Sequence, residues 1–308
     1  MSRSPNRSQS QPSTRPDGDP LAPYRGRLLG LGYRMLGSRS DAEDVVQDAY
    51  LRFAGATDIE NTEAFLVTIV TRLCLDRLKS AHARREVYVG PWLPEPVLDA
   101  DALSPDTATE LADDLSFALL LALDRLTPPE RAAFLLHDVF DTPFPEIASI
   151  LDRSEASCRQ LASRARRAVR DQAPPPAVLP DTHGELLTAF AEAAASGNVT
   201  RLTALLRDDA VAMTDGGGRK RAALQPIHCA DRIARFFIGI AKKLRDSGDH
   251  ISFEPATING KTGMLIFLNG KLDQTVSCAI DGDRIAALYL VSNPDKLRWA
   301  QCPPQQSS

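Results

Sequence analysis

Several kinds of residue and segment are scarce in this sequence, and their scarcity excludes several classes of protein. The five cysteines are odd in number and form no CxxC pair (Cys74, Cys158, Cys229, Cys278 and Cys302), which fits neither a disulfide framework nor a clustered zinc site. No apolar run approaches the roughly 20 residues that span a bilayer, and the N-terminal segment lacks an apolar signal core. We therefore expect reduced thiols, no metal or other cofactor, and a soluble cytoplasmic protein without a membrane segment.

The chain does contain enough apolar material for more than one core. Of its 308 residues, 43% are hydrophobic, and the formal net charge is −4. This length predicts two or three domains, and this charge allows basic patches opposite acidic faces but no overall basic surface. Segments rich in Pro, Ser, Gln or Gly divide the chain. We predict a disordered tail at 1–20, folded blocks at 21–89, 111–172 and 182–300, linkers at 90–110 and 173–181, and a second tail at 301–308.

The first block carries an acidic helix followed by a basic one. Ser40 and Glu43 match a capping box, and the helix that follows turns Asp41, Asp44, Gln47 and Asp48 away from its apolar face. A second helix, from about 62 to 83, would bury Phe65, Ile69, Leu73 and Leu78. Its outer side carries Arg72, Asp76, Arg77 and Lys79 and ends in Arg84 and Arg85. This basic side is a candidate nucleic-acid footprint.

The second block has the pattern of a helix-turn-helix. Thr127 and Glu130 form a second capping box, with prolines at the next two positions. A short helix at 145–151 leads to a turn at Asp152 and Arg153, and Ser154 is placed to cap the next helix. That helix has one apolar face and an opposite face that suits a DNA major groove. The apolar face comprises Cys158, Leu161, Ala162, Ala165 and Val169, and the outer face Arg159, Gln160, Ser163, Arg164, Arg166, Arg167 and Arg170.

The third block predicts an α+β domain. Helices are indicated at 183–196, 199–206 and 230–244, followed by apolar runs at 251–258, 262–268, 271–280 and 284–291. The runs are separated by Asn259-Gly260, Asn269-Gly270 and Asp281-Gly282, which are strong hairpin signals. We expect an antiparallel meander.

Residues 41–53, 64–85 and 126–170, taken in this order, resemble the extracytoplasmic-function sigma factors of bacterial RNA polymerase. The resemblance implies a promoter-specificity subunit with two helical sigma domains, region 2 (21–89) and region 4 (111–172), joined by a linker. Its partners would be promoter DNA and core polymerase, through the β′ clamp helices and the β flap, and the free chain would be a monomer. It implies polymerase docking by Asp41, Asp44, Gln47 and Asp48, minus-10 contacts by Arg72, Asp76, Lys79, Arg84 and Arg85, and minus-35 contacts by Ser157, Arg159, Gln160, Ser163, Arg164, Arg166 and Arg167.

The third block resembles the SnoaL-like cone domain, with a curved antiparallel sheet, that is fused to one subgroup of these factors. Three short signatures carry the likeness: WLPEP, DGGG and NPDKL. The resemblance implies that they form interdomain contacts through which this domain regulates the other two. The residues are Trp92, Leu93, Pro94, Glu95 and Pro96, then Asp215, Gly216, Gly217 and Gly218, then Asn293, Pro294, Asp295, Lys296 and Leu297.

Other interpretations stay open at this point. The charged helix faces could be solvated surfaces, and DGGG could be a flexible turn or a phosphate cradle, although it lacks the P-loop spacing. A stand-alone DNA-binding regulator with a ligand-sensing C-terminal domain is the main alternative, and a small ligand in that domain fits either reading. A cone-domain enzyme would draw on Asp215, His228, Asp231 and His250, but no pair has a spacing that compels general acid–base catalysis. We expect no catalytic residue.

Overall fold

A computed structural model describes residues 21–85, 88–98, 103, 114–171 and 180–298. The two predicted tails, most of the linker beyond Leu98, nearly all of the proline-rich linker and Cys302 lie outside the described residues. In the described part of the chain, no helix combines the length and apolar character needed to cross a membrane. The four cysteines in that part are free thiols.

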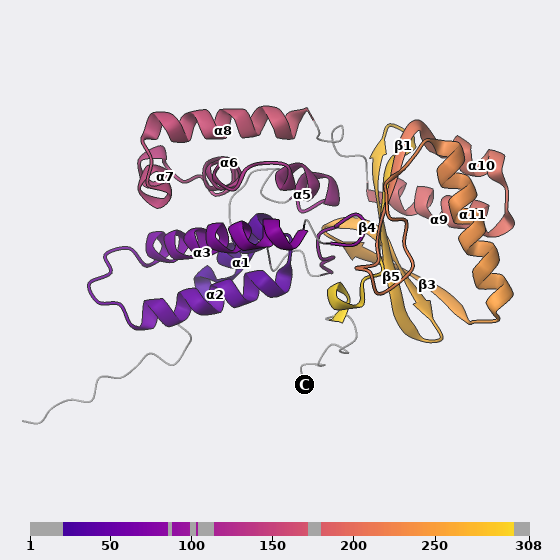
Figure 1. The fold of residues 1–308 in the computed structure, drawn as a ribbon, viewed down its shortest axis with the longest axis horizontal. Coiled ribbons are helices and arrows are strands. Elements are labelled where there is room, and N and C mark those ends of the chain that lie inside the picture. Colours follow the sequence, from indigo (N-terminus) through magenta and orange to yellow (C-terminus); the bar gives the residue numbers. More distant parts are fainter. Residues whose placement is uncertain (1–20, 86–87, 99–102, 104–113, 172–179, 299–308) are drawn as a thin grey trace, which may run out of the picture.

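The N-terminal half of the molecule is helical and forms two layers (Figure 1). The lower layer in Figure 1 holds α1 (Ala22–Leu36), α2 (Arg39–Ala54) and α3 (Thr62–Arg85). The upper layer holds α5 (Phe117–Asp124), α6 (Pro128–Phe134), the π-helical turn η2 (Leu135–Val139), α7 (Phe144–Leu151) and α8 (Glu155–Arg170).

The predicted start of α2 is wrong by two residues. Ser38, and not Ser40, is the N-cap: its backbone is extended and its Oγ accepts a hydrogen bond from the Asp41 amide at 3.2 Å. Glu43, the expected second half of a capping box, pairs instead with Arg39 one turn earlier, at 3.1 Å. The preceding residue, Gly37, ends α1 in the left-handed region at φ 69°, so the chain turns between the two helices within two residues, Gly37 and Ser38.

The buried face of α3 is wider than predicted. Leu66, Val70 and Cys74 are fully buried, whereas the predicted Phe65, Ile69 and Leu73 are only half-buried. The reason is that α3 packs against α1 and α2 on one side and against α6 and α7 on the other. A helix between two layers needs apolar residues around most of its circumference.

The helix-turn-helix prediction is confirmed at its turn and in its buried face. Asp152 ends α7 in the left-handed region at φ 52°, and Ser154 caps α8 through the Ser157 amide at 3.3 Å. Thr127 caps α6 together with Glu130. The buried side of α8 is the predicted set, Cys158, Leu161, Ala162, Ala165 and Val169.

The C-terminal half is an α+β domain with one six-stranded sheet. Its elements are α9 (Pro180–Ser196), α10 (Val199–Ala204), β1 (Leu206–Asp215), β2 (Ile227–His228), α11 (Ala230–Ser247), β3 (Ile251–Ile258), β4 (Lys261–Leu268), β5 (Lys271–Asp281), β6 (Arg284–Val291) and the 3-10 turn η3 (Pro294–Lys296). The strand order is β2-β1-β6-β5-β4-β3. The predicted meander is confirmed for β3 to β6, all antiparallel; β1 and β2 were not predicted, and β1 pairs parallel to β6, so the sheet is mixed.

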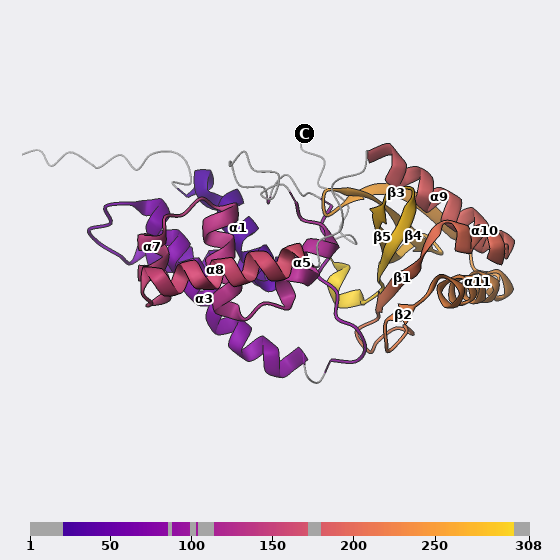
Figure 2. The ribbon, with the colours of Figure 1, turned by 90° about the horizontal axis from the view of Figure 1, so that it is seen from above.

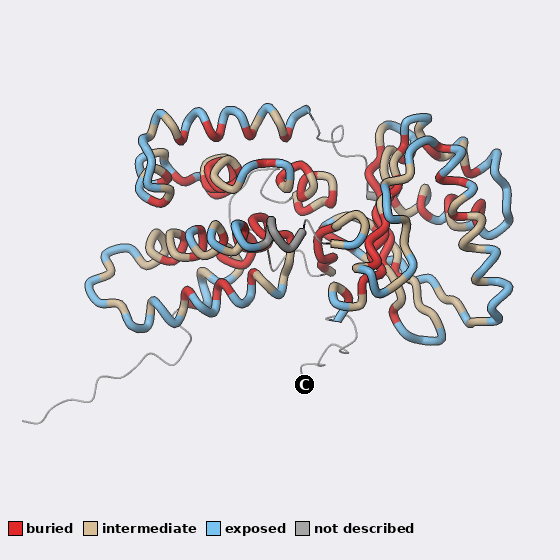
Figure 3. The backbone as a smooth tube through the Cα atoms, viewed as in Figure 1, coloured by how far each residue is buried: buried red, intermediate tan, exposed pale blue. Residues whose placement is uncertain are grey.

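The two faces of this sheet have different partners. Helices α9, α10 and α11 cover one face, and the other face turns toward the helical half of the molecule (Figures 1 and 2). One apolar cluster joins the helices of α1 to α8 across both layers, a second lies between the sheet and its own helices, and a third lies on the opposite side of the sheet. The third cluster includes Leu93 and Phe117, which lie outside the C-terminal half, so this cluster contains residues from both halves. Figure 3 shows buried backbone in the sheet and in the helical layers.

Candidate functional site

The three short signatures meet around one buried carboxylate. Asp215, the last residue of β1, is 0% exposed. Its Oδ2 accepts from the Lys296 ammonium at 2.7 Å and from the Leu93 amide at 2.9 Å. Its Oδ1 accepts from the Tyr88 hydroxyl at 2.5 Å and from the Gly217 amide at 3.0 Å. One carboxylate thus holds the segment around WLPEP, the DGGG turn and NPDKL together.

Aromatic rings and further backbone bonds enclose this group. The Lys296 ammonium lies 4.4 Å from the centre of the Trp92 ring and 5.2 Å from that of Tyr88, and it also donates to the Leu93 carbonyl. Asn293 donates from its side chain to the Tyr88 hydroxyl at 2.9 Å. Burial, and then the hydrogen bond to Asp215, raises the pKa of Tyr88, so this hydroxyl stays protonated and keeps donating.

The DGGG turn is occupied by the protein's own groups. Its Gly217 amide already donates to Asp215, and Gly217 and Gly218 have φ values of 60° and 71° that favour glycine. Two of the three cations that follow are paired, Arg219 with Asp295 at 3.1 Å and Lys220 with Asp273 at 2.7 Å, and Arg221 is exposed. These pairings favour a contact turn over a phosphate cradle.

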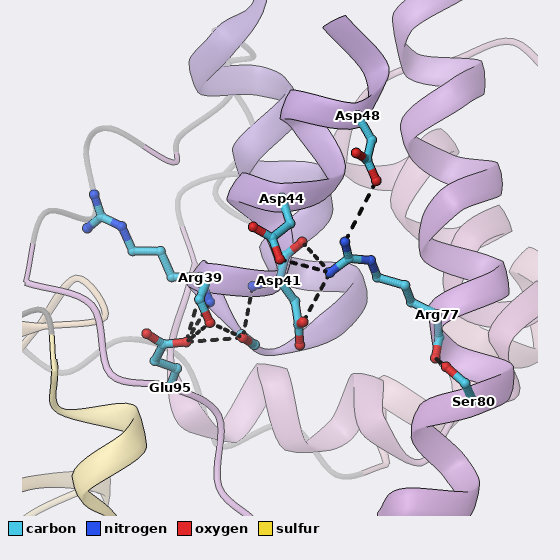
Figure 4. Close-up of polar contacts among 9 residues, drawn as sticks. Arg39, Asp41, Asp44, Asp48, Arg77, Ser80 and Glu95 are labelled. Atoms are coloured by element: carbon cyan, nitrogen blue, oxygen red, sulfur yellow. Dashed lines mark hydrogen bonds and ion pairs between the residues drawn. The ribbon is translucent and has the colours of Figure 1, made fainter. Parts of the chain in front are cut away.

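The WLPEP segment also contacts the start of α2. Glu95 is 7% exposed, and its Oε2 accepts from the Arg39 amide at 2.9 Å and from the Ser38 hydroxyl at 3.1 Å (Figure 4). The Glu95 amide donates to the Gly37 carbonyl at 2.8 Å. The carboxylate therefore caps the positive end of a helix dipole. Burial nevertheless raises the pKa of Glu95, an effect that the hydrogen bonds from Ser40 and Ser38 partly offset.

A second polar cluster ties α1, the linker and the β3–β4 turn together. The Tyr33 hydroxyl donates to the Glu95 carbonyl at 2.7 Å, and the Asn259 side chain donates to Tyr33 at 2.6 Å and to the Leu115 carbonyl at 3.0 Å. Asn259 also exchanges two hydrogen bonds with Val97, through its side-chain oxygen and its backbone amide. This one asparagine satisfies buried groups from three parts of the chain.

The predicted polymerase-docking face is partly paired within the protein. Arg77 of α3 lies 3.1 Å from Asp41, 3.6 Å from Asp44 and 3.9 Å from Asp48 (Figure 4). The three carboxylates keep 46%, 66% and 52% of their side-chain surface exposed, and Gln47 is exposed beside them. The face is therefore accessible, with a cation at its edge.

The predicted minus-10 residues do not behave as one group. Arg72 reaches across to the end of α7, donating to the carbonyls of Ser149 at 3.0 Å and Ile150 at 3.2 Å. Asp76 and Lys79 pair with each other at 2.9 Å on the exposed side of α3. The side chains of Arg84 and Arg85, in the last turn of α3, lie outside the described residues.

The outer face of α8 is basic and exposed, but several of its arginines have internal partners. Arg159 pairs with Glu155 at 2.6 Å, Arg164 with Glu130 at 3.1 Å and Arg166 with Asp138 at 2.5 Å. Gln160, Ser163 and Arg167 are exposed, and Ser157 is half-buried at the cap. A face of this kind can exchange carboxylate partners for phosphate.

The candidate catalytic residues are engaged separately. Asp215 belongs to the buried cluster just described, and Asp231 pairs with Arg235 at 2.8 Å on the exposed side of α11. His228, on β2, and His250, before β3, are both exposed. These four residues therefore do not form a pair of neighbouring groups that could act together in general acid–base catalysis.

Sequence reasoning missed several residues of the interdomain contacts. Tyr33, Tyr88 and Asn259 all contribute hydrogen bonds there. Asn259 was assigned to a hairpin turn, and its φ of 53° agrees, so nothing in the pattern pointed to a second role for its side chain. A buried hydroxyl or amide leaves no periodic signal.

Comparison with known proteins agrees with this layout. Residues 21–84 match the family "Sigma-70 region 2" and residues 116–169 match "Sigma-70, region 4". The ECF RNA polymerase sigma factor SigJ of Mycobacterium tuberculosis is 38% identical over 285 residues, covering 88% of this chain and 90% of SigJ. A probable ECF sigma factor of the same organism, SigI, is 31% identical over 288 residues, which cover 89% of this chain and 92% of SigI.

The crystal structure of M. tuberculosis SigJ is similar over most of the chain. It superimposes with a TM-score of 0.70 at 34% identity, covering 90% of this chain and 97% of SigJ. The predicted fold class, two helical sigma domains followed by a SnoaL-like α+β domain, is thereby confirmed. With both sigma regions in order and full-length relatives of the same kind, the chain belongs to the extracytoplasmic-function (ECF) sigma factors of RNA polymerase.

Proposed function

We propose that this sigma factor is regulated by its own C-terminal domain, which sets the arrangement of regions 2 and 4 through the cluster around Asp215. In the cytoplasm, the acidic face of Asp41, Asp44, Gln47 and Asp48 would dock on the β′ clamp helices, and region 4 would meet the β flap. The exposed side of α3 would engage the minus-10 element and α8 the minus-35 element. The chain would direct initiation without performing chemistry itself.

The observation that supports regulation is the complete burial of Asp215 between parts of the chain from both halves. A carboxylate and an ammonium removed from water are stable only while they remain together, and breaking such a pair by removing one partner costs about 3–5 kcal/mol. Asp215 and Lys296 both belong to the C-terminal half, so undocking would break instead the bonds that this buried pair makes with Tyr88 and Leu93.

The Glu95 contact extends the same restraint to α2. One end of the WLPEP segment is held at Asp215 by Leu93, and the Glu95 carboxylate is held at the first turn of the helix that carries the docking face. Undocking of the C-terminal domain would free the Leu93 amide from Asp215 and remove the tether at one end of the segment that carries Glu95. A two-state element of this kind is what coupling between domains requires.

The test is run-off transcription from genomic promoters with purified core polymerase and full-length protein. Asp215→Asn removes the charge that holds Lys296, so we expect transcript yield to change by about fivefold or more, within the usual range of coupling energies. Asp209→Asn is the matched control, because Asp209 lies on the same strand with an exposed side chain paired to Arg207. Its yield should equal that of the wild type.

Hydrogen exchange at the Leu93 amide distinguishes the outcomes, since this amide donates to Asp215. Faster exchange in Asp215→Asn with unchanged transcription would reject the regulatory proposal. Transcripts from none of the three proteins, combined with duplex binding in the absence of core polymerase, would favour a stand-alone regulator.

A further inference from the structure

The C-terminal domain encloses a cavity that the contacts described above do not use. It has a volume of about 310 Å³ and lies between α9, α11 and strands β3 to β6. These helices and the sheet form the outer end of the molecule, away from the sigma regions (Figures 1 and 2). The volume is at the lower end of the range of small-molecule sites.

The deep end of the cavity is apolar and tightly defined. Phe190 and Phe237 meet edge to face, with their ring centres 4.9 Å apart, and Ala194, Val276 and Leu290 complete this end. All five side chains are buried. Such a lining has nothing to hydrogen-bond, so it favours the apolar part of a ligand over water.

The open end has a different character. Phe253 is 52% exposed there, which is unusual for a large apolar side chain, and Ala195 and Arg245 are exposed beside it. Among the described residues that line the cavity, Arg245 alone is charged, and Gln274 adds a polar amide. Arg245 donates to the Ala195 carbonyl, which holds the guanidinium near the rim. A guanidinium has further donors for an anion.

We propose that this cavity binds an elongated apolar molecule with an anionic head group, such as a medium-length acyl carboxylate. The apolar chain would occupy the end formed by Phe190, Phe237 and Leu290, and the head group would lie at Arg245 and Gln274. We further infer that a ligand in the cavity changes the contact between the C-terminal domain and the sigma regions; this second inference rests on the proposed function.

The sheet provides the connection, because the same strands form both surfaces. Val276 and Leu290 are direct partners across β5 and β6 and face the cavity. Their neighbours Tyr289 and Val291 belong to the apolar cluster on the opposite face, where Tyr289 stacks on Phe117 of α5 at 5.4 Å. Alternate residues of a strand point to opposite faces, so a ligand that displaces Leu290 acts one residue away from the docked surface.

The first experiment measures binding of decanoate and decanol to the full-length protein by titration calorimetry. Ala241→Phe fills the cavity from a half-buried position of α11, and Arg245→Gln removes the charge at the rim. Arg235→Gln is the control, since Arg235 lies on the exposed side of the same helix and pairs with Asp231. Circular dichroism would verify that each variant is folded.

We expect decanoate to bind the wild type and the control equally and Ala241→Phe at least tenfold more weakly. Arg245→Gln should weaken decanoate about fivefold, the equivalent of ~1 kcal/mol for an exposed charge pair, and leave decanol nearly unchanged. The ligand site would be overturned by any of three results: no heat with millimolar probe, equal affinity for both probes, or no effect of Ala241→Phe.

The second readout is hydrogen exchange at the Leu93 amide with and without decanoate. A change in exchange that is absent in Ala241→Phe would support the connection to the sigma regions. Binding with unchanged exchange at Leu93 would overturn that connection. Because binding is measured without reference to transcription, failure of the ligand site and failure of the regulatory function are distinguishable.

Discussion

At the scale of single residues, the contact between the halves contains a buried ion pair beside an apolar cluster. Asp215 is fully buried and the Lys296 side chain is 13% exposed. A buried ion pair often adds little net stability compared with apolar residues of similar size, yet it is costly to break. Because the pair lies within the C-terminal half, it remains formed on undocking, and the groups that would lose partners are Tyr88 and Leu93.

The contact between Glu95 and the start of α2 is expected to depend on pH. Burial raises the pKa of its carboxyl above the ordinary value of about 4.3. A raised pKa in the folded protein means that the folded state favours the protonated carboxyl more than the unfolded state does. The contribution of Glu95 to the free energy of unfolding is then complete below pH ~4.3 and is lost as the pH rises through the pKa of the folded protein. We predict that Glu95→Gln, which keeps the oxygen acceptor for Arg39 and Ser38, gains stability relative to wild type as pH increases across this window.

Urea unfolding of the full chain at several pH values measures this difference. Glu254→Gln is the matched control, because Glu254 is exposed on β3, and its difference from wild type should not vary with pH. If the difference in unfolding free energy between Glu95→Gln and wild type did not change with pH, ionisation of Glu95 would not affect the stability of the folded protein, and the prediction would be wrong.

At the scale of elements, the cap of α8 should govern promoter binding without contacting phosphate. Ser154→Ala removes the acceptor for the Ser157 amide and should destabilise the first turn of α8 by about 1 kcal/mol. In the holoenzyme, we predict weaker binding to a minus-35 duplex with the same dependence of log K on log salt. Arg167→Gln, which alters an exposed cation of the same helix, should instead reduce that slope by about 1. Fluorescence anisotropy at several salt concentrations compares the two, and a smaller slope for Ser154→Ala would contradict the assignment.

The elements that sequence reasoning found are those whose burial follows a simple period. Helix α8 has one buried face, and β3 to β6 are separated by Asn-Gly and Asp-Gly turns, so their positions were predicted to within a residue or two. Helix α1 was not predicted, because its glycines lower the helix propensity of this segment. A Cβ on Gly32 would lie 3.0 Å from Ala42 of α2. Close packing of α1 on α2 therefore requires glycine, the residue type that makes a helix hard to predict from sequence.

Neither strand β1 nor the interdomain cluster could be predicted from local sequence patterns, because both depend on contacts between distant parts of the chain. The first part of β1 carries Arg207, Asp208 and Asp209, which are poor strand formers, and its parallel pairing with β6 comes from distant parts of the chain. The three signatures were expected to meet, but the resemblance, and not the residue pattern, supplied that expectation. Lys296 and Asp215 are 81 residues apart, and no periodicity connects them.

At the scale of the whole molecule, the compact arrangement conflicts with simultaneous contact to both promoter elements. Arg72 of α3 bonds to the end of α7, and the two helical layers share one core. Promoter elements at minus 10 and minus 35 lie about 25 base pairs apart, on the order of 85 Å along straight DNA at ~3.4 Å per step. If α3 and α8 each read their proposed element, the layers must separate when the holoenzyme forms.

Fluorescence energy transfer can measure that separation. We predict that transfer between dyes at Ser80→Cys on α3 and Asp171→Cys at the end of α8, both exposed positions, falls when core polymerase is added. Exposed Cys229 would be replaced by serine. A pair at Ser80→Cys and Leu51→Cys, both within region 2, should not change. If the C-terminal domain restrains the layers as proposed, Asp215→Asn in the same labelled background should lower transfer without polymerase. Unchanged transfer in a transcribing complex would mean that the compact form itself is competent for promoter recognition, and regulation would then have to act on the docking face of α2 rather than on the separation of the layers.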